Sequence, residues 1–283
     1  MIDSIREKTG AGIRRICGVL SLPRSSYYQA SQPTKAETED EKIGEVIEQI
    51  FHKHRRRYGY RRIHDDLKDL DIQCGPSRVR RIMKQRGLRA IQPRNYVPRT
   101  SDGRADRPSP NRLLDRQAPS RANEVWAGDI TYIPTAEGWR YLAVVIDLYS
   151  RRIVGWSLSD HLRADLVNQA LRQALGSRAC HQELIFHSDR GSQYGSRSFR
   201  SALHDAGITQ SMSRRANPYD NAWTESFMGT LKSELLHDCH LANEREARTQ
   251  IFSYIDGYYN TERKHSAIGY LSPSKFENQN YEN

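Results

Sequence analysis

Val125-Trp-Ala-Gly-Asp-Ile-Thr-Tyr-Ile133 is an apolar stretch that a single carboxylate, Asp129, interrupts at its centre. A second apolar stretch, Leu184-Ile-Phe-His-Ser-Asp189, ends on another carboxylate and continues into Arg-Gly-Ser-Gln-Tyr. Both stretches have the length and composition of buried strands. Because aspartate is disfavoured within strands, each of these acidic side chains predicts a role other than packing.

A third acidic residue, Glu225, lies near the start of a predicted amphipathic helix, Asp220-Asn-Ala-Trp-Thr-Glu-Ser-Phe. The helix carries one apolar stripe, predicted to consist of Trp223, Phe227 and Leu231. At about 100° per residue, Glu225 falls about 200° from the start of that stripe, and Lys232 returns to within about 20° of Glu225. We therefore expect one face that packs and an opposite face that presents Glu225, Lys232 and Asn221.

Two strands and a helix thus each supply one carboxylate. Hard divalent cations take oxygen ligands, and pairs of such cations support phosphodiester chemistry. For Asp129 alone, a structural role would be the default interpretation. Because Asp189 and Glu225 occur in matching settings, a catalytic role is the preferred interpretation for Asp129. The pattern indicates an enzyme that acts on nucleic acid.

Basic residues are concentrated in the first part of the chain. The 283 residues have a formal net charge of +10 and a pI near 9.5. The basic excess falls within residues 1–120, whereas residues 121–283 are nearly neutral. Net charge alone does not distinguish DNA from RNA or from an acidic membrane. The distribution predicts a basic binding segment followed by a catalytic segment.

Several classes of protein are disfavoured by the sequence. The cysteines are far apart and form no Cys-x-x-Cys pair, which argues against a zinc ribbon and a disulfide framework. The N-terminus lacks the apolar core of a signal peptide, and the longest apolar run, Tyr141-Leu-Ala-Val-Val-Ile146, is too short to span a bilayer. We expect a cytoplasmic, nucleoid-associated protein.

Composition and periodicity divide the chain into four predicted segments. They are an N-terminal helical fragment and tether (1–40, with a polar tether at 31–40), a helix-turn-helix-like DNA-binding module (41–90), a Pro-rich basic linker (91–120), and a catalytic core with a C-terminal helical extension (121–283).

The predicted DNA-binding module contains three amphipathic helices. Apolar residues recur at helical spacing from Ile43 to Phe51 and from Tyr60 to Leu70. The third helix opens at Pro76 and ends at a Gly87 cap. Basic side chains of this module are candidate phosphate contacts, namely Arg61, Arg62, Arg78, Arg81 and Lys84. A solvated basic surface is the alternative interpretation.

The catalytic core has a characteristic order of predicted elements. Three strands with short connections indicate an antiparallel meander, and two further strands alternate with helices. The order β-β-β-α-β-α-β-α predicts an α/β fold with a mixed five-stranded sheet flanked by helices. This is the order of a ribonuclease-H-like fold.

Three motifs carry a resemblance to a known family: Trp126-Ala-Gly-Asp-Ile-Thr-Tyr-Ile-Pro-Thr135, His187-Ser-Asp-Arg-Gly-Ser-Gln-Tyr194 and Asp220-Asn-Ala-Trp-Thr-Glu-Ser-Phe-Met-Gly-Thr-Leu-Lys-Ser-Glu234. They look like the OrfB-type transposases of bacterial insertion sequences, whose catalytic core is similar to retroviral integrase. The interval of 35 residues between Asp189 and Glu225 is that family's hallmark. The helical segment at 57–63 and the tail at 259–273 also match, so the resemblance spans nearly the whole chain.

The resemblance implies a transposase of the DDE type. Asp129, Asp189 and Glu225 would bind two Mg²⁺ (or Mn²⁺) ions in each active site. A water would cut at the element's end and release a 3′-hydroxyl, which would then attack a second phosphodiester directly. Lys232 would contact the terminal DNA, and Asn221 would contact substrate or support the site.

The resemblance also implies partners. They are DNA, as the terminal inverted repeats of an element and its target, and further copies of the chain in a synaptic complex. Members of the family usually act as a longer fusion made by ribosomal frameshifting, so the product of an upstream reading frame is another candidate partner.

Alternative roles remain open at several positions. Asp147 ends an apolar strand and fits either a turn residue or a group that supports the site. His187 fits a core or supporting role, and Arg190 fits either a loop contact or a DNA contact. Besides a transposase, a metal-dependent nuclease of the same fold and a non-catalytic DNA-binding protein are compatible with the sequence.

Overall fold

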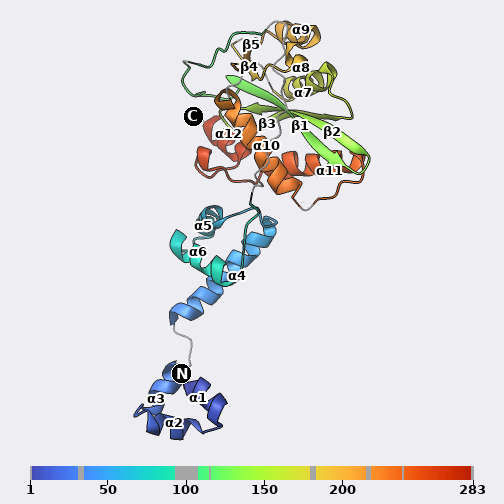
Figure 1. Ribbon diagram of the computed structural model, residues 1–283. Helices are drawn as coiled ribbons and strands as arrows, with labels where there is room; N and C mark the ends of the chain where they lie inside the picture. Colours follow the sequence, from blue (N-terminus) through green and yellow to red (C-terminus); the bar gives the residue numbers. More distant parts are fainter. Residues whose placement is uncertain are drawn as a thin grey trace. The chain divides into compact units, whose positions relative to one another are not determined.

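The computed structural model describes residues 2–30, 35–92, 108–114, 116–178, 183–214, 218–237 and 239–281. The chain forms two compact units, a helical unit (Met1–Ala90) and a sheet unit (Ile91–Asn283). Figure 1 colours both along the sequence, from the blue N-terminus to the red C-terminus. Among the described residues, no helix has both the length and the apolar character needed to cross a membrane.

The described part of the helical unit contains α1 (Ile2–Thr9), α2 (Ile13–Val19), α3 (Arg24–Ala30), α4 (Lys35–Lys53), α5 (Tyr60–Asp69) and α6 (Pro76–Gln85). The last three helices pack on one another, which confirms the predicted three-helix module. Their core consists of the buried side chains Ile47, Ile50, Phe51, Tyr58, Ile63, Leu67, Val79, Ile82 and Met83.

The start of α4 differs from the expectation. The polar segment 31–40 was expected to be a tether, but α4 begins at Lys35. The physical reason lies in tertiary contacts, because Glu39 and Asp40 in this first part of α4 form ion pairs with Arg78 of α6. The end of α6 agrees with the prediction: Gly87 has a φ of 67°, and the Leu88 amide donates to the Met83 carbonyl at 2.9 Å.

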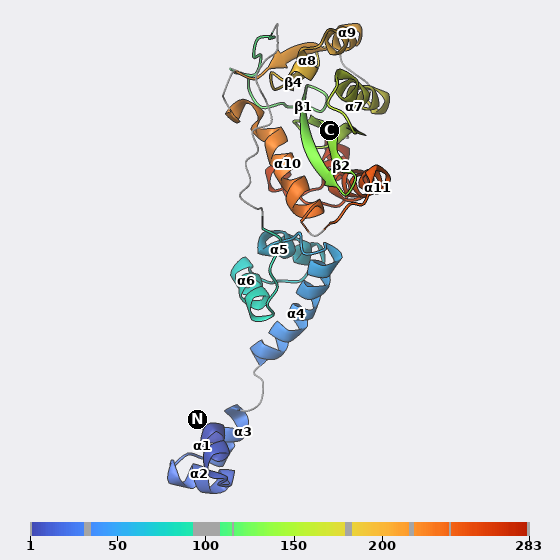
Figure 2. The same ribbon diagram turned by 45° about the vertical axis from the view of Figure 1, so that its right-hand side comes forward.

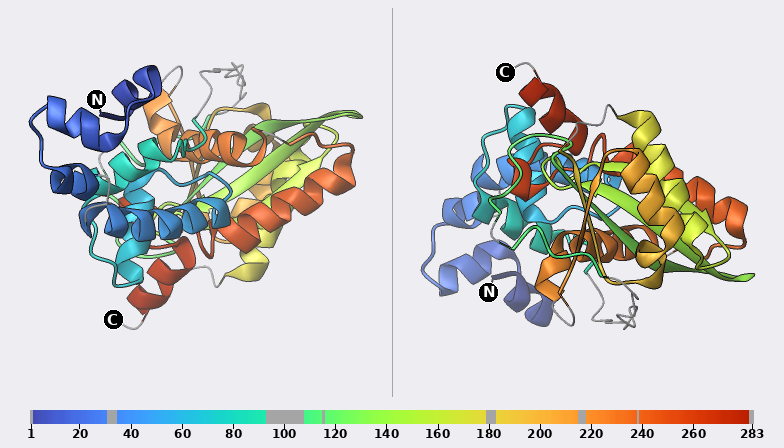
Figure 3. Two further views of the ribbon diagram at one scale, coloured as in Figure 1. Left: turned by 90° about the horizontal axis from the view of Figure 1, so that it is seen from below. Right: turned by 90° about the horizontal axis from the view of Figure 1, so that it is seen from above.

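The sheet unit is built on five strands: β1 (Val125–Thr135), β2 (Gly138–Asp147), β3 (Ile153–Ser159), β4 (Ile185–Ser188) and β5 (Thr209–Met212). Their order in the sheet is β3-β2-β1-β4-β5. The pairs β1–β2 and β2–β3 are antiparallel, whereas β1–β4 and β4–β5 are parallel. This mixed sheet confirms the predicted ribonuclease-H-like fold. The long β1–β2 hairpin, in green, extends to the edge of the unit (Figure 3).

Helices cover both faces of this sheet (Figure 2). On one face, α7 (Ala164–Ser177) and α9 (Arg197–Asp205) pack on a core that includes Trp126 and Phe186. On the other, α10 (Ala222–Leu235) and α11 (Glu244–Tyr254) contact β1. Short elements complete the unit: α8 (Ser192–Gly195), η1 (Pro218–Asn221), the π-helical turn η2 (Ile255–Tyr259), η3 (Ser266–Ile268) and α12 (Pro273–Tyr281).

The end of the predicted linker contacts the sheet unit. Residues 93–107 and 115 lie outside the described part of the chain. The Ser109 hydroxyl donates to the Gln210 side chain at 2.9 Å, and the Arg112 amide donates to the Ser211 hydroxyl at 2.9 Å. The segment therefore runs beside β5, a contact that its Pro-rich composition does not predict.

Candidate active site

The parallel pairing of β1 with β4 brings two predicted carboxylates side by side. Gly128 of β1 is the register partner of Ser188 of β4. Asp129 and Asp189 each follow one of these paired residues directly. β4 ends at Ser188, whereas β1 continues, so Asp189 begins the loop that leads to α8. The C-terminal ends of parallel strands are a common location for active sites in α/β sheets.

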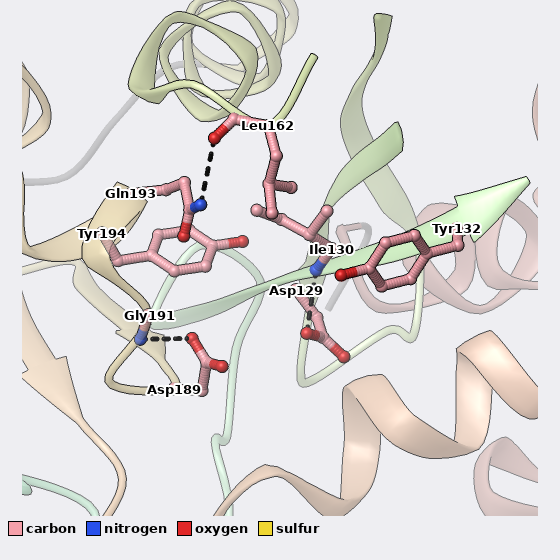
Figure 4. Close-up of a pocket in the computed structure, with 8 residues that line it drawn as sticks. All are labelled: Asp129, Ile130, Tyr132, Leu162, Asp189, Gly191, Gln193 and Tyr194. Atoms are coloured by element: carbon pink, nitrogen blue, oxygen red, sulfur yellow. Dashed lines mark hydrogen bonds between the residues drawn. The ribbon is translucent and has the colours of Figure 1, made fainter. Parts of the chain in front are cut away.

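Backbone amides orient both carboxylates (Figure 4). Asp129 accepts a hydrogen bond from the Ile130 amide at 2.8 Å, and Asp189 accepts one from the Gly191 amide at 3.0 Å. Both side chains border an open pocket of about 350 Å³. The other residues that line it are Ile130, Tyr132, Leu162, Gly191, Gln193 and Tyr194.

Charges from the loop after β4 and from α10 act on Asp129. Burial, the Asp189 charge and the Glu225 charge raise the pKa of Asp129 to about 7, while the Ile130 amide and Lys232 act in the opposite direction. Burial lowers the pKa of Lys232, and Asp129 opposes that shift. The charges of Asp189, Glu225 and Lys232 are therefore within electrostatic range of Asp129.

The helix that carries Glu225 is rotated slightly from the predicted orientation. Its buried side chains are Thr224, Phe227, Met228, Leu231 and Leu235. Trp223, which was expected in the apolar stripe, is only partly buried. The stripe is shifted toward Thr224 and Met228, and α10 packs on β1. Glu225 is therefore exposed beside the stripe and not opposite it, since it falls about 100° from Thr224 and about 60° from Met228. Desolvation raises its pKa.

The donor chemistry of this site fits a hard divalent cation, although the ligands are not preassembled. Within the described residues, no three His, Cys, Asp or Glu side chains are close enough together to hold a metal ion. The adjacent aspartates nevertheless repel each other, as the raised pKa of Asp129 records. A dication would relieve that repulsion. Asp129 and Asp189 are the two oxygen donors that the sheet itself aligns.

The segment before α10 is held from several directions. Asp220 accepts from Arg214 at 3.0 Å and from the Asn111 side chain at 2.9 Å. Asn221 is 7% exposed, and its side-chain oxygen is buried without a hydrogen-bond partner in the described structure. Arg190 donates to the Ser213 carbonyl at 2.8 Å, so at least part of its guanidinium stabilises the end of β5.

His187 and Asp147 take structural positions. The two ring nitrogens of His187 contact the hydroxyls of Ser211 at 2.9 Å and Ser213 at 3.1 Å, and burial lowers its pKa. The core role predicted for this histidine is thus supported. Asp147 is fully buried and accepts from the amides of Tyr149 and Ser150 at the β2–β3 turn, and from the amide of Asn123 just before β1. Of the two roles left open for Asp147, the structure shows the turn role.

The candidate basic side chains of the helical unit differ in the groups that they contact. Arg78 contacts Asp40 at 2.7 Å and Glu39 at 3.0 Å, and Arg81 contacts Asp40 at 2.6 Å. Lys84 is exposed. Arg61 and Arg62 lie over tyrosine rings, each with its guanidinium carbon 5.5 Å from the ring centroid. Arg78 and Arg81 are thus partly neutralised within the unit.

Two residues that border the pocket, Gln193 and Tyr194, were not singled out from the sequence. The Gln193 side-chain amide donates to the Leu162 carbonyl at 3.1 Å. Both residues lie in a quoted motif, but their contacts depend on the tertiary fold. The sequence leaves Arg263 of the tail open as a DNA contact, whereas the structure gives it a buried ion pair with Glu234 of α10 at 2.7 Å.

Comparison with known proteins gives a consistent assignment. A family model described as an HTH-like domain matches residues 38–96, and models described as an integrase core domain match residues 119–218 and 206–273. The transposase for insertion sequence element IS904 of Lactococcus lactis subsp. lactis is 43% identical over 249 residues, which cover 88% of this chain and 98% of that protein. Transposase InsF for insertion sequence IS3A of Escherichia coli K12 is 38% identical over 272 residues, 95% of this chain and 94% of InsF.

Among solved structures, this chain aligns with one chain of a simian T-cell lymphotropic virus intasome in complex with PP2A regulatory subunit B56 gamma. The TM-score is 0.47 and the identity 16%, and the alignment covers 72% of this chain and 67% of that one. The sequence relatives and the two kinds of domain model carry the assignment. With its helix-turn-helix-like module and its integrase core, this chain belongs to the family of insertion-sequence transposases.

Proposed function

We propose that this transposase cleaves the ends of its insertion element and joins them to target DNA by direct transesterification. The observation that carries the proposal is the Asp129–Asp189 pair, aligned by adjacent strands and subject to the charges of Glu225 and Lys232. Such a cluster of mutually repelling carboxylates on an integrase core fits a site for Mg²⁺ or Mn²⁺, with two ions per site. Bound ions would supply charge neutralisation at the phosphate and acidify a water or hydroxyl nucleophile.

The proposed reaction has two chemically equivalent steps. In the first, a water oxygen attacks the phosphorus at the element's end, the bond from phosphorus to the 3′-oxygen breaks, and that oxygen takes a proton to become a 3′-hydroxyl. In the second, the 3′-hydroxyl loses its proton and attacks a target phosphodiester, whose own 3′-oxygen leaves. Asp129, Asp189 and Glu225 would hold the divalent ions to which the reacting phosphate binds, and no covalent protein–DNA intermediate forms.

Contacts to DNA are assigned from both units. Near the site, Lys232 contacts the terminal nucleotides, and Asn221 and Arg190 support or contact the substrate. In the helical unit, exposed basic side chains contact phosphates, with Arg61, Arg62, Arg78, Arg81 and Lys84 as candidates. Because two element ends must be joined together, we propose a homo-oligomer in the synaptic complex, with the upstream reading-frame product as a further partner.

The test uses the purified full chain with Mg²⁺, labelled element-end DNA and a target duplex. Joined products support strand transfer, whereas cleaved products alone identify a nuclease. We expect Asp129→Asn, Asp189→Asn and Glu225→Gln each to abolish both products, while Asp205→Asn, on the exposed end of α9, retains them. If any of the three carboxylate variants still joins DNA at the wild-type rate, the assigned site is wrong.

A further inference from the structure

Tyr194 combines a buried ring with a hydroxyl at the active-site pocket. The residue is 2% exposed, and its ring packs against Phe186 and Phe199 with centroid separations of 6.1 and 5.3 Å. Its hydroxyl oxygen lies 3.1 Å from the position that a Cβ atom on Gly128 would occupy. The aromatic core thus directs this hydroxyl to the backbone of β1, immediately before Asp129 (Figure 4).

The hydroxyl lacks a partner in a place where partners are expected. Buried tyrosines usually donate or accept a hydrogen bond. In the part of the chain that the structure describes, no hydrogen bond to the Tyr194 hydroxyl is present, and Tyr194 lines the pocket that Asp129 and Asp189 also border. Burial and the charges of Asp129 and Asp189 raise the pKa of the phenol well above its ordinary value. Tyr194 therefore presents a neutral O–H donor.

The surrounding groups indicate what this donor binds. The carboxylates at the pocket only accept hydrogen bonds when ionised. The side-chain amide of Gln193 already donates to the Leu162 carbonyl. A phosphodiester that reaches the two aspartates brings non-bridging oxygens, which are acceptors that need donors. The pocket supplies one at Tyr194.

We propose that Tyr194 is a catalytic residue whose hydroxyl donates a hydrogen bond to one non-bridging oxygen of the scissile phosphodiester. The inference rests on the proposed function, because it takes the Asp129–Asp189 pair as the place where that phosphate binds. The scissile phosphate would then be held from two sides, through the ions at Asp129 and Asp189 and through the Tyr194 hydroxyl. Contacts from two sides would fix the orientation of the phosphorus for in-line attack.

The test compares wild type with Tyr194→Phe, which removes only the unpartnered oxygen and keeps the ring in its aromatic cluster. Tyr149→Phe is the matched control, since its ring contacts Phe276 at the β2–β3 turn. Single-turnover cleavage is measured on end DNA with an ordinary scissile phosphate and with each of its two phosphorothioate diastereomers. We expect Tyr194→Phe to slow the ordinary substrate by about 10- to 100-fold, with the unfolding temperature unchanged.

The phosphorothioates distinguish a direct contact from an indirect one. Sulfur at the contacted oxygen accepts hydrogen bonds poorly, so one diastereomer should shrink the effect of Tyr194→Phe to less than about threefold, while the other retains it. An equal loss on all three substrates, or no loss, would overturn the proposal.

A binding measurement separates this proposal from the proposed function. In Ca²⁺, affinity for the end duplex should fall by about two- to tenfold in Tyr194→Phe and stay constant in Tyr149→Phe. If wild type binds DNA without cutting or joining it, the proposed function fails. The affinity difference still decides Tyr194: a loss supports the phosphate contact, and an unchanged affinity overturns it.

Discussion

In the helical unit, basic and acidic side chains neutralise one another, as Arg78 does with Asp40 at 2.7 Å. In the sheet unit, Asp129 and Asp189 lie side by side, and burial together with the Asp189 charge raises the pKa of Asp129. The first arrangement is complete without a ligand, whereas the second costs folding free energy that a bound dication would offset. The comparison teaches that the number of charges in a segment does not locate its binding site. What matters is where the fold places like charges next to each other.

The largest effect is expected from removing one of the two adjacent carboxylates. Asp189→Asn should lower DNA joining by at least about 10³-fold, because a ligand of the reacting region is lost. The same change relieves repulsion at Asp129, so the metal-free variant should unfold at a temperature equal to or above that of wild type. Single-turnover assays and thermal unfolding measure the two quantities. Loss of activity together with a lower unfolding temperature would show that Asp189 is mainly structural.

A compensated pair inside the sheet unit should respond in the opposite way. Arg263→Met leaves Glu234 buried without its cation, and we expect the free energy of unfolding to fall by about 3–5 kcal/mol in urea titrations. The double variant Arg263→Met with Glu234→Gln should recover part of that loss, since no unpaired charge remains. Equal stability of wild type and the single variant would show that the ion pair does not anchor α10.

The pH dependence of stability provides a third comparison. Because the folded pKa of Asp129, about 7, exceeds its ordinary value of 3.8, folded metal-free protein holds this proton more tightly than the unfolded chain. The contribution of Asp129 to stability therefore falls as pH rises from about 4 to 7. Asp129→Asn should remove this loss, and Mg²⁺ should raise the unfolding temperature by several degrees more at pH 8 than at pH 5.

Thermal unfolding at both pH values, with and without Mg²⁺, tests this expectation. Asp205→Asn is the control, because that carboxylate is exposed on α9. A stabilisation by Mg²⁺ that is equal at pH 5 and pH 8, or equal in wild type and Asp129→Asn, would contradict it.

The smallest effects are expected in the helical unit. Lys84 is exposed, whereas Arg78 is engaged by Asp40 and Glu39. Lys84→Ala should weaken DNA binding across all sequences and reduce the salt dependence of log K by about one. Arg78→Ala should change that slope less, because its charge is already neutralised within the unit. Binding titrations over a range of salt concentrations measure both, and a larger change for Arg78→Ala would reverse the comparison.

Much of the site could be predicted from local sequence pattern. Asp129 and Asp189 could be identified because aspartate is unusual in strands. Asp129 lies at the centre of one apolar stretch, and Asp189 ends another. The exposure of Glu225 outside the packed stripe follows from helical periodicity. The phase of that stripe was wrong by one residue at Trp223, because periodicity does not say which edge of a stripe meets the neighbouring strand.

Other features could not be predicted, because they join residues that are distant in sequence. The buried pair of Arg263 with Glu234 is one, and the side chain of Asn260, which exchanges hydrogen bonds with the backbone of Ile153 at 2.9 Å, is another. From the sequence, Asn260 and Arg263 are possible DNA contacts of the tail. Both are buried, so their polar character serves the packing of the tail on the sheet unit.

By itself, the sequence determined the types and order of the elements, the three acidic positions and the uneven distribution of charge. These depend on composition and on periodicity over a few residues, which are local properties. Only the tertiary structure decided that Asp40 neutralises Arg78, that Asp129 is buried beside Asp189, and that Tyr194 lines the pocket. Burial and partner choice depend on contacts between distant segments, and the energy of a charge depends on its burial and its partners.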